Sequence, residues 1–171
     1  MRYYLASDNR TNNFSMLIWS EGITVARFAA LARATAVERC GIVITEMGED
    51  WLKGTLTVTT GTQQANGTLH TGAAAVLAES LASTAANGVI DLERFACLGQ
   101  QISSNYIKTV PLGATITGTT RPLSIAAKTQ VWGVNIVAAS GELVCVSRVM
   151  MAVVPSAQNA LIPVNSRPIV S

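Results

Sequence analysis

One stretch of this chain decides its fold: Gly72-Ala-Ala-Ala-Val-Leu-Ala-Glu79-Ser-Leu-Ala-Ser83-Thr-Ala-Ala-Asn87. Small and apolar residues fall on nearly every side of the helix that it predicts over about residues 72–86, so this helix should be buried. Glu79 is the only Asp, Glu, Lys or Arg between Gly54 and Ile90. Because a buried carboxylate is costly without a partner, we expect Glu79 either to pair with a distant cation or to take part in chemistry.

Strand-forming segments lie on both sides of this helix. Before it, β-branched residues are frequent in 42–46 and 51–60, and Gly48-Glu49-Asp50 between them indicates a hairpin. After it come four further runs, at 95–108, 114–121, 129–138 and 143–154. A helix that is apolar on most sides needs a sheet to cover it. The order of the segments therefore predicts a buried helix wrapped by a sheet.

Additional segments precede and follow this core. Apolar residues at helical spacing predict another helix from Ile23 to Cys40, with Thr24 as its cap and Gly41 as its stop. We expect three parts in the chain: a polar N-terminal extension over 1–15, one domain over 16–155, and an irregular C-terminal tail over 156–171.

The composition excludes several classes of function. The net charge is only +2, and no basic run with interleaved aromatic residues indicates nucleic-acid binding. Charged residues make up 13% of the chain, a low share that favours a surface partly covered by copies of the same chain. The chain has three cysteines without a CxxC motif and one histidine, which favours buried thiols in the cytoplasm over a metal site. A central acid argues against a membrane helix.

Polar groups gather where the loop enters the buried helix. Free backbone N–H groups at a helix start can stabilise an oxyanion, and His70 and Thr71 lie at this position. Gln64 offers a further amide donor, and Ser83 shares a helix face with Glu79. These groups suit acyl transfer, in which water or the carboxylate attacks. A structural interpretation also stands for His70, because a lone histidine near a helix start is often a cap.

The distance along the helix limits how these groups act together. Thr71 and Glu79 are eight residues apart, which is roughly 12 Å at a rise of about 1.5 Å per residue. One carbonyl group cannot lie within about 3 Å of both in a single chain. If they share a site, Thr71 of one subunit must face Glu79 of another, and a two-fold antiparallel pairing of helices gives two identical sites.

At these residues the sequence resembles the hotdog-fold acyl-CoA thioesterases. The similarity begins with Gln64-Ala-Asn-Gly67-Thr-Leu-His70-Thr-Gly72 and continues with Val76-Leu-Ala-Glu79-Ser-Leu-Ala-Ser83. The most similar group is that of the 4-hydroxybenzoyl-CoA and 1,4-dihydroxy-2-naphthoyl-CoA thioesterases, the latter serving menaquinone synthesis. Further similar stretches are Arg121-Pro-Leu123, Gln130-Val-Trp132 and Gly141-Glu-Leu-Val-Cys145-Val-Ser-Arg148.

The resemblance implies an α+β hotdog fold: an antiparallel sheet of about six strands around a central helix, here with an extra N-terminal helix. It implies hydrolysis of an acyl-CoA thioester, with an aromatic acyl group expected, by Glu79 as nucleophile or general base. The Thr71 amide would bind the thioester oxygen, His70 and Gln64 would position that end, and Ser83 would orient the carboxylate or water.

The resemblance also implies partners. CoA would be part of the substrate, with no separate cofactor, and the chain would form dimers and homotetramers. The expected CoA contacts are Tyr106, Lys108, Thr109, Ser124, Ala127 and Lys128.

Two alternatives remain. Thr71 stands where the family usually has glycine, and Tyr106 where close relatives have histidine, so a non-catalytic acyl-CoA-binding protein of the same fold is one alternative. A dehydratase on this fold is the other, although the Glu79–Ser83 spacing fits it poorly.

Overall fold

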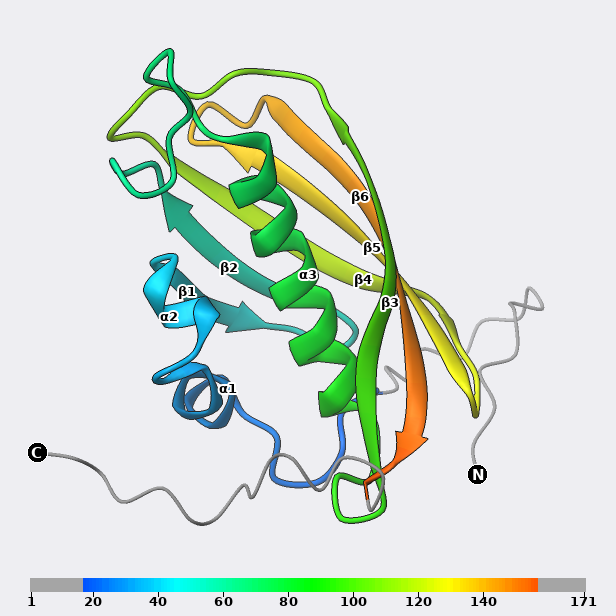
Figure 1. The fold of residues 1–171 in the computed structure, drawn as a ribbon. Coiled ribbons are helices and arrows are strands. Elements are labelled where there is room, and N and C mark those ends of the chain that lie inside the picture. Colours follow the sequence, from blue (N-terminus) through cyan, green and yellow to red (C-terminus); the bar gives the residue numbers. More distant parts are fainter. Residues whose placement is uncertain (1–16, 157–171) are drawn as a thin grey trace, which may run out of the picture.

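The computed structural model describes residues 17–156, which form one sheet and one hydrophobic core. The helices are α1 (Val25–Ala32), α2 (Ala36–Arg39) and α3 (Thr71–Gly88). The strands are β1 (Ile42–Met47), β2 (Leu52–Thr57), β3 (Phe95–Tyr106), β4 (Thr115–Ile125), β5 (Thr129–Ala138) and β6 (Leu143–Pro155). The strand order is β1-β2-β4-β5-β6-β3, and each neighbouring pair is antiparallel. The expected α+β fold, a six-stranded antiparallel sheet wrapped around a central helix, is confirmed (Figure 1).

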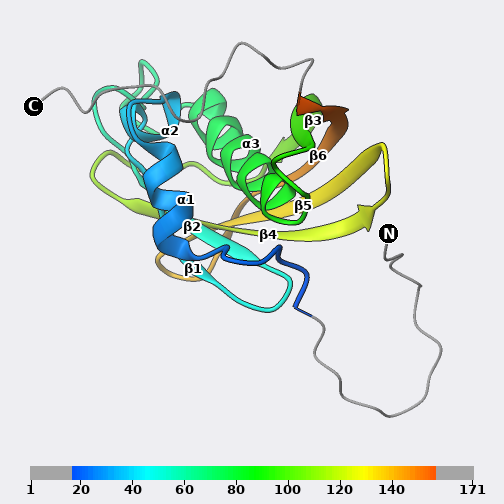
Figure 2. The same cartoon turned by 90° about the horizontal axis from the view of Figure 1, so that it is seen from below.

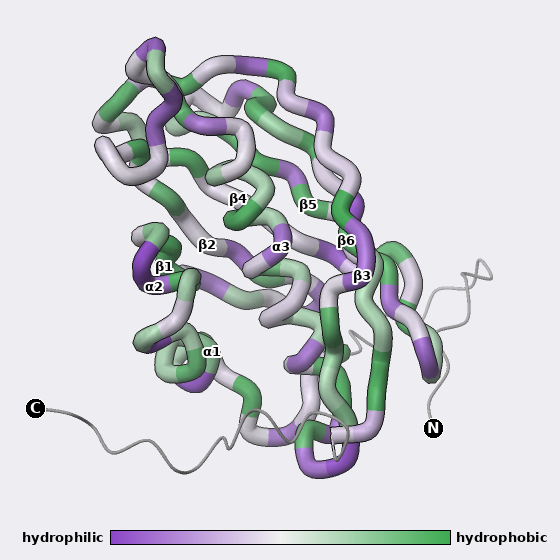
Figure 3. Tube along the Cα trace, in the orientation of Figure 1, coloured by the Kyte–Doolittle hydropathy of each residue, from purple (hydrophilic) through white to green (hydrophobic). Residues whose placement is uncertain are grey.

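The helix α3 lies across the inner side of the sheet, where glycines in the strands let its side chains approach closely. Figure 2 shows α1 and α2 beside α3 on this same side. Mostly pale or apolar residues follow one another along α3 (Figure 3). A Cβ added to Gly118 of β4 would lie 2.5 Å from Cδ1 of Leu81, and one added to Gly54 of β2 would lie 2.9 Å from its Cδ2. The helix therefore rests directly on glycines of two central strands.

The last turn of α3 is held by polar side chains. Asn87 donates to the carbonyl oxygens of Ser83 and Cys97, at 2.9 and 3.2 Å, and accepts from the Cys97 N–H at 2.9 Å. The fully buried Gln130 of β5 donates to the Ala86 carbonyl at 3.5 Å and accepts from the Trp132 indole at 2.9 Å. These bonds satisfy carbonyl groups that a helix end leaves free, and they fix α3 to β3 and β5.

The predicted helix from Ile23 to Cys40 is two helices instead of one. Thr24 caps α1 by accepting from the Arg27 N–H, as expected. The chain then breaks at Ala34, whose φ is 58°, and Thr35 caps the short α2. A left-handed residue ends a right-handed helix, and the apolar spacing alone did not reveal it. The predicted N-terminal extension, 1–15, lies outside the described residues, as does the tail apart from its first residue.

Candidate functional site

The start of α3 leaves one backbone donor free. His70 is the N-cap, and its Nδ1 accepts from the Gly72 N–H at 2.9 Å. Its carbonyl accepts from the N–H groups of Ala73 and Ala74. Among the described residues, the Thr71 N–H has no hydrogen-bond acceptor. Thr71 therefore supplies the one uncommitted amide at the positive end of the helix dipole, which is where an oxyanion would be stabilised.

The cap fixes the orientation and tautomer of His70. Because Nδ1 accepts a hydrogen bond from Gly72, the proton of the neutral ring lies on Nε2. A Cβ on Gly72 would lie 2.9 Å from Nδ1 and 3.0 Å from Cε1, so the glycine leaves room for the ring. The ring is exposed, and its Nε2–H is directed away from the cap. The structural interpretation of His70 as a cap is thus correct, and this cap also leaves a donor for a ligand.

Glu79 lies two turns further along α3, half-buried against β3. Burial raises the pKa of its carboxyl group above the ordinary value of 4.5. Within residues 17–156 it forms no ion pair and accepts no hydrogen bond. The distant cation that would have explained it structurally is not found in this part of the chain. A carboxylate that is desolvated and unpaired is poised to act as a base or nucleophile.

Ser83 follows Glu79 by one helical turn and is also half-buried. Its carbonyl accepts from Asn87, whereas its hydroxyl has no partner among the described residues. The hydroxyl is consequently free to bond to the carboxylate or to a water molecule on the same face of α3.

Other predicted residues gather in a small cleft at the start of α3, with a volume of about 130 Å³. Its lining includes Gln64, Thr71, Tyr106, Lys108 and Thr109. The Gln64 side chain donates to the Thr68 hydroxyl at 2.8 Å, which holds it at this edge. Predicted oxyanion residues and predicted CoA contacts therefore meet in one place.

Lys108 is not a free cation at this cleft. Its ammonium group forms an ion pair with Glu142, a residue whose pairing with Lys108 no sequence motif indicated. The hydrogen bond from Lys108, with a second from Ser140 and the charge of Lys108, lowers the pKa of the Glu142 carboxyl group. A phosphate at Lys108 would have to compete with this carboxylate.

The remaining predicted CoA contacts, Ser124, Ala127 and Lys128, lie at the other end of the sheet. The Lys128 carbonyl accepts from Val153, which pairs with Cys97 near the start of β3, whereas the cleft lies at Tyr106, where β3 ends. Nine residues of strand separate these ends, about 30 Å at a rise of about 3.3 Å per residue. Figure 1 shows the β4–β5 turn far from the start of α3. One chain therefore does not bring the two groups together.

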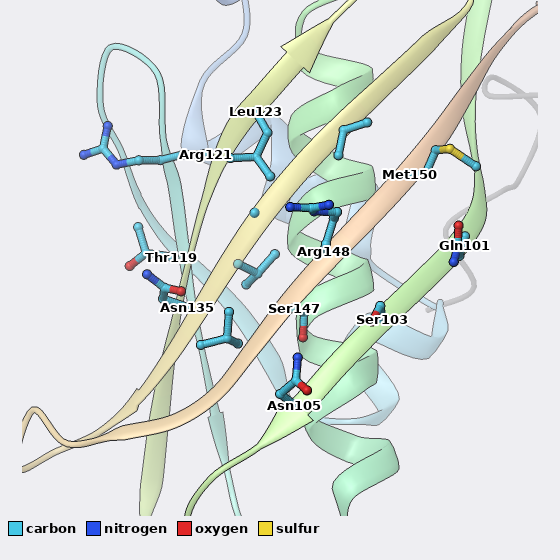
Figure 4. A pocket seen from close by; sticks show the side chains of 14 residues that line it. Gln101, Ser103, Asn105, Thr119, Arg121, Leu123, Asn135, Ser147, Arg148 and Met150 are labelled. Atoms are coloured by element: carbon cyan, nitrogen blue, oxygen red, sulfur yellow. The ribbon is translucent and has the colours of Figure 1, made fainter.

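A larger hollow, about 820 Å³, lies on the opposite side of the sheet from α3 (Figure 4). Side chains of β3, β4, β5 and β6 line it, with Arg148 near its centre (Figure 4). Neither Glu79 nor any residue of the helix start reaches it. Because the acyl transfer expected from the sequence would use the Glu79 carboxylate and the free Thr71 amide, we place the candidate site at α3 despite the greater size of this hollow.

The expectations about metal binding, membrane helices and cysteines can also be compared with the structure. In the range 17–156, no three His, Cys, Asp or Glu side chains lie close enough to hold a metal ion. No helix in that range has the length and hydropathy to cross a membrane. Cys97 and Cys145 are buried and free, as expected, but Cys40 is partly exposed.

Comparison with known proteins identifies the family of this chain. Residues 66–145 match the family model described as the thioesterase superfamily. The proofreading thioesterase EntH of Cronobacter sakazakii is 36% identical over 138 residues, which is 80% of this chain and 98% of that protein. The 1,4-dihydroxy-2-naphthoyl-CoA hydrolase of Escherichia coli is 32% identical, over 80% of this chain and 99% of the hydrolase. A thioesterase structure from Haemophilus influenzae superposes with a TM-score of 0.77 at 30% identity, over 81% of this chain and 95% of that one.

The fold and these relatives define a hotdog-fold hydrolase of the esterase and thioesterase class. The chain belongs to the thioesterase superfamily.

Proposed function

We propose that this protein hydrolyses acyl-CoA thioesters, with an aromatic acyl group as the preferred substrate. The observation that carries the proposal is the unpaired, half-buried Glu79 carboxylate on the same helix whose first amide, that of Thr71, is uncommitted. The aromatic preference is supported by the name of the Escherichia coli relative, whose substrate is a naphthoyl-CoA. We place the protein in the cytoplasm, where CoA thioesters and free thiols occur together.

The chemistry requires few groups. The Thr71 N–H, together with the Nε2–H of His70, would bind the thioester oxygen as it becomes negatively charged. Glu79 would attack the carbonyl carbon, or take a proton from the water that does, with the Ser83 hydroxyl orienting it. A thiol with a pKa of about 8.5 leaves as thiolate without a strong acid. One carboxylate and one oxyanion site are therefore sufficient.

The site is proposed to form between two subunits that pair along β3, with Glu79 supplied by one subunit and Thr71 by the other. This edge strand has twelve residues, none of them charged, so its open edge favours pairing with another chain. Antiparallel pairing of two copies would turn the second copy end over end, which places the Glu79 of one subunit toward the Thr71 of the other. It would also bring Ser124, Ala127 and Lys128 of one subunit toward Lys108 and Thr109 of the other. A homodimer is then the smallest active unit, and two dimers would form a tetramer.

Release of free thiol from a panel of aromatic, short-chain and long-chain acyl-CoAs tests the function. We expect the aromatic thioesters to give the highest kcat/KM and Glu79→Gln to lower it by about 10²–10⁴-fold. Single turnover in ¹⁸O-labelled water tests for the nucleophilic role: label in the Glu79 carboxylate and unlabelled oxygen in the product acid require an anhydride intermediate that water opens at the Glu79 carbonyl carbon. Turnover by Glu79→Gln at the wild-type rate would refute the proposal.

Mixing inactive variants tests the shared site. Glu79→Ala and His70→Ala should each be nearly inactive, and refolding them together should restore part of the activity by forming one intact interface site. Because His70→Ala also removes a helix cap, which costs about 1 kcal/mol, His70→Asn is the matched variant that keeps a capping side chain. The absence of any recovery with either partner would contradict a site built from two subunits.

A second candidate is a protein that binds acyl-CoA without hydrolysing it. It is favoured by one observation: the side chain of Thr71 is exposed and lines the cleft beside its own amide. In that case the wild-type chain would bind a CoA thioester without releasing thiol, and Thr71→Gly would introduce turnover by opening the oxyanion site.

A further inference from the structure

We propose that Gly99 and the bulge that follows it form a recess in β3 that positions the Glu79 carboxylate for reaction. This role rests on the proposed function, because it gives Glu79 a defined place from which to act. Gly99 itself touches no substrate, so it is a positioning residue.

The carboxylate occupies the space that a side chain at position 99 would need. A Cβ built on Gly99 would overlap Oε1 of Glu79 and would lie 3.1 Å from Cδ and 3.5 Å from Oε2. Gly99 is not among the residues with positive φ, so an alanine fits its backbone conformation. What matters at this position is therefore the missing side chain and not the freedom of the backbone.

The strand is irregular at this point. Gly99 pairs with Met151 and Gln101 pairs with Met150, so Gln100 is an additional residue without a counterpart in β6. Such a bulge bends a strand and redirects its side chains, and bulges are frequent beside active sites. Here the bulge follows the glycine that faces the carboxylate, so the two features together shape the recess.

Other glycines of the sheet make room for core side chains and not for Glu79. A Cβ on Gly118 or Gly54 would clash with Leu81, which is fully buried among other side chains. At Gly99 the clash falls on the end of a flexible, half-buried side chain, which can swing aside. Replacing Gly99 should therefore move the carboxylate at little cost in stability, whereas replacing Gly118 should weaken the core.

The variant Gly99→Ala tests this role with two matched controls. We expect it to keep its thermal midpoint and its KM but to lose about 100-fold in kcat, since misplacing a reacting group by about 1 Å costs that much. Gly133→Ala adds a methyl group on the outer side of the sheet, 3.4 Å from Leu123, and should change none of the thermal midpoint, KM and kcat. Gly118→Ala should lower the thermal midpoint while the folded fraction keeps its kcat.

A double-mutant cycle with Glu79→Asp distinguishes positioning from a general effect of the methyl group. Aspartate is one methylene shorter, so its carboxylate no longer reaches the added Cβ. Gly99→Ala should then lower kcat several-fold less in the Glu79→Asp background than in the wild type, because coupled residues are not additive. An equal loss in both backgrounds would overturn the proposal.

A titration gives a readout that needs no turnover. With ¹³C-labelled glutamate and Glu79→Gln for assignment, the Glu79 midpoint should be lower in Gly99→Ala than in the wild type, because the displaced carboxylate gains water. If the wild type hydrolyses no thioester, the proposed function fails and this titration alone decides the positioning role. If Glu79→Gln is inactive while Gly99→Ala keeps the wild-type kcat and midpoint, only the positioning role fails.

Discussion

A single carboxyl group, that of Glu79, links the stability of this chain to its proposed catalysis. The raised pKa of Glu79 comes from burial, which penalises the charged form. Its folded state therefore holds the proton more tightly than its unfolded state. The resulting contribution to stability is fully present below the ordinary pKa of 4.5 and is lost as the pH rises through the higher folded-state value.

Glu79→Gln should therefore be more stable than the wild type at pH 7, while the proposed function predicts that it is nearly inactive. The difference in free energy of unfolding should vanish below about pH 4, which urea titrations at both pH values would measure. The pH profile of kcat/KM in the wild type should rise through the same elevated pKa. A variant less stable than the wild type at pH 7 would show that Glu79 has a stabilising partner.

The ion pair between Lys108 and Glu142 allows a second test at the scale of single residues. If Lys108 binds a CoA phosphate, Glu142→Gln should lower KM by no more than about 5-fold without changing kcat, since breaking an exposed ion pair has only a small effect. The effect should diminish in high salt. Glu46→Gln breaks the comparable Glu46–Lys53 pair, whose residues do not line the cleft, and should leave KM unchanged. Equal KM values for all three proteins would mean that Lys108 does not contact the ligand.

Among the secondary-structure elements, α3 depends on how its last turn is anchored. Asn87→Ala removes three hydrogen bonds and leaves both backbone groups of Cys97 without their side-chain partner. We expect a loss of about 2–4 kcal/mol in the free energy of unfolding. Asn135→Ala, on an exposed position of β5, should change it by less than about 0.5 kcal/mol. Similar values for the two variants in chemical denaturation would contradict the anchoring role of Asn87.

Sequence patterns predicted the elements well where one periodicity governs a segment. The β-branched runs gave all six strands in order, and the small-residue run gave α3, because burial imposes a regular spacing of apolar residues. The break at Ala34 escaped this reasoning, since a backbone angle leaves no trace in hydropathy.

The sequence predicted the reactive groups of the candidate site but not the residues that position them or pair with them. Glu79, His70 and Thr71 carry chemistry that a reader of sequence can recognise. Gly99 and the Lys108–Glu142 pair do not, because their importance depends on what lies opposite them in space. The separation of Thr71 from Glu79 followed from helix length alone, and it pointed beyond the single chain.

For the whole molecule, the two edges of the sheet differ. The edge strand β1 is half as long as β3, has a bulge between Ile44 and Glu46, and carries the charge of Glu46; these features protect it from pairing. Ile102→Glu on β3 should therefore break the proposed dimer, because it places a charge where two copies meet. Val43→Glu on β1 is the matched control, because it introduces the same charge on the other edge strand at an exposed position. Val43 is 56% exposed and Ile102 is 39% exposed. Light scattering after size exclusion would detect the difference, and equal masses would argue against pairing through β3.

The uneven accessibility of the sulfur atoms has a practical consequence for enzymology. Burial raises the pKa of Cys97 to about 12, and Cys145 is also buried, whereas Cys40 at the end of α2 is partly exposed. A chromogenic disulfide added to monitor liberated coenzyme will accordingly react with the polypeptide as well. Without substrate, the reagent should react rapidly with one thiol per chain. Replacing Cys40 with serine should abolish this background reaction and leave the hydrolase active.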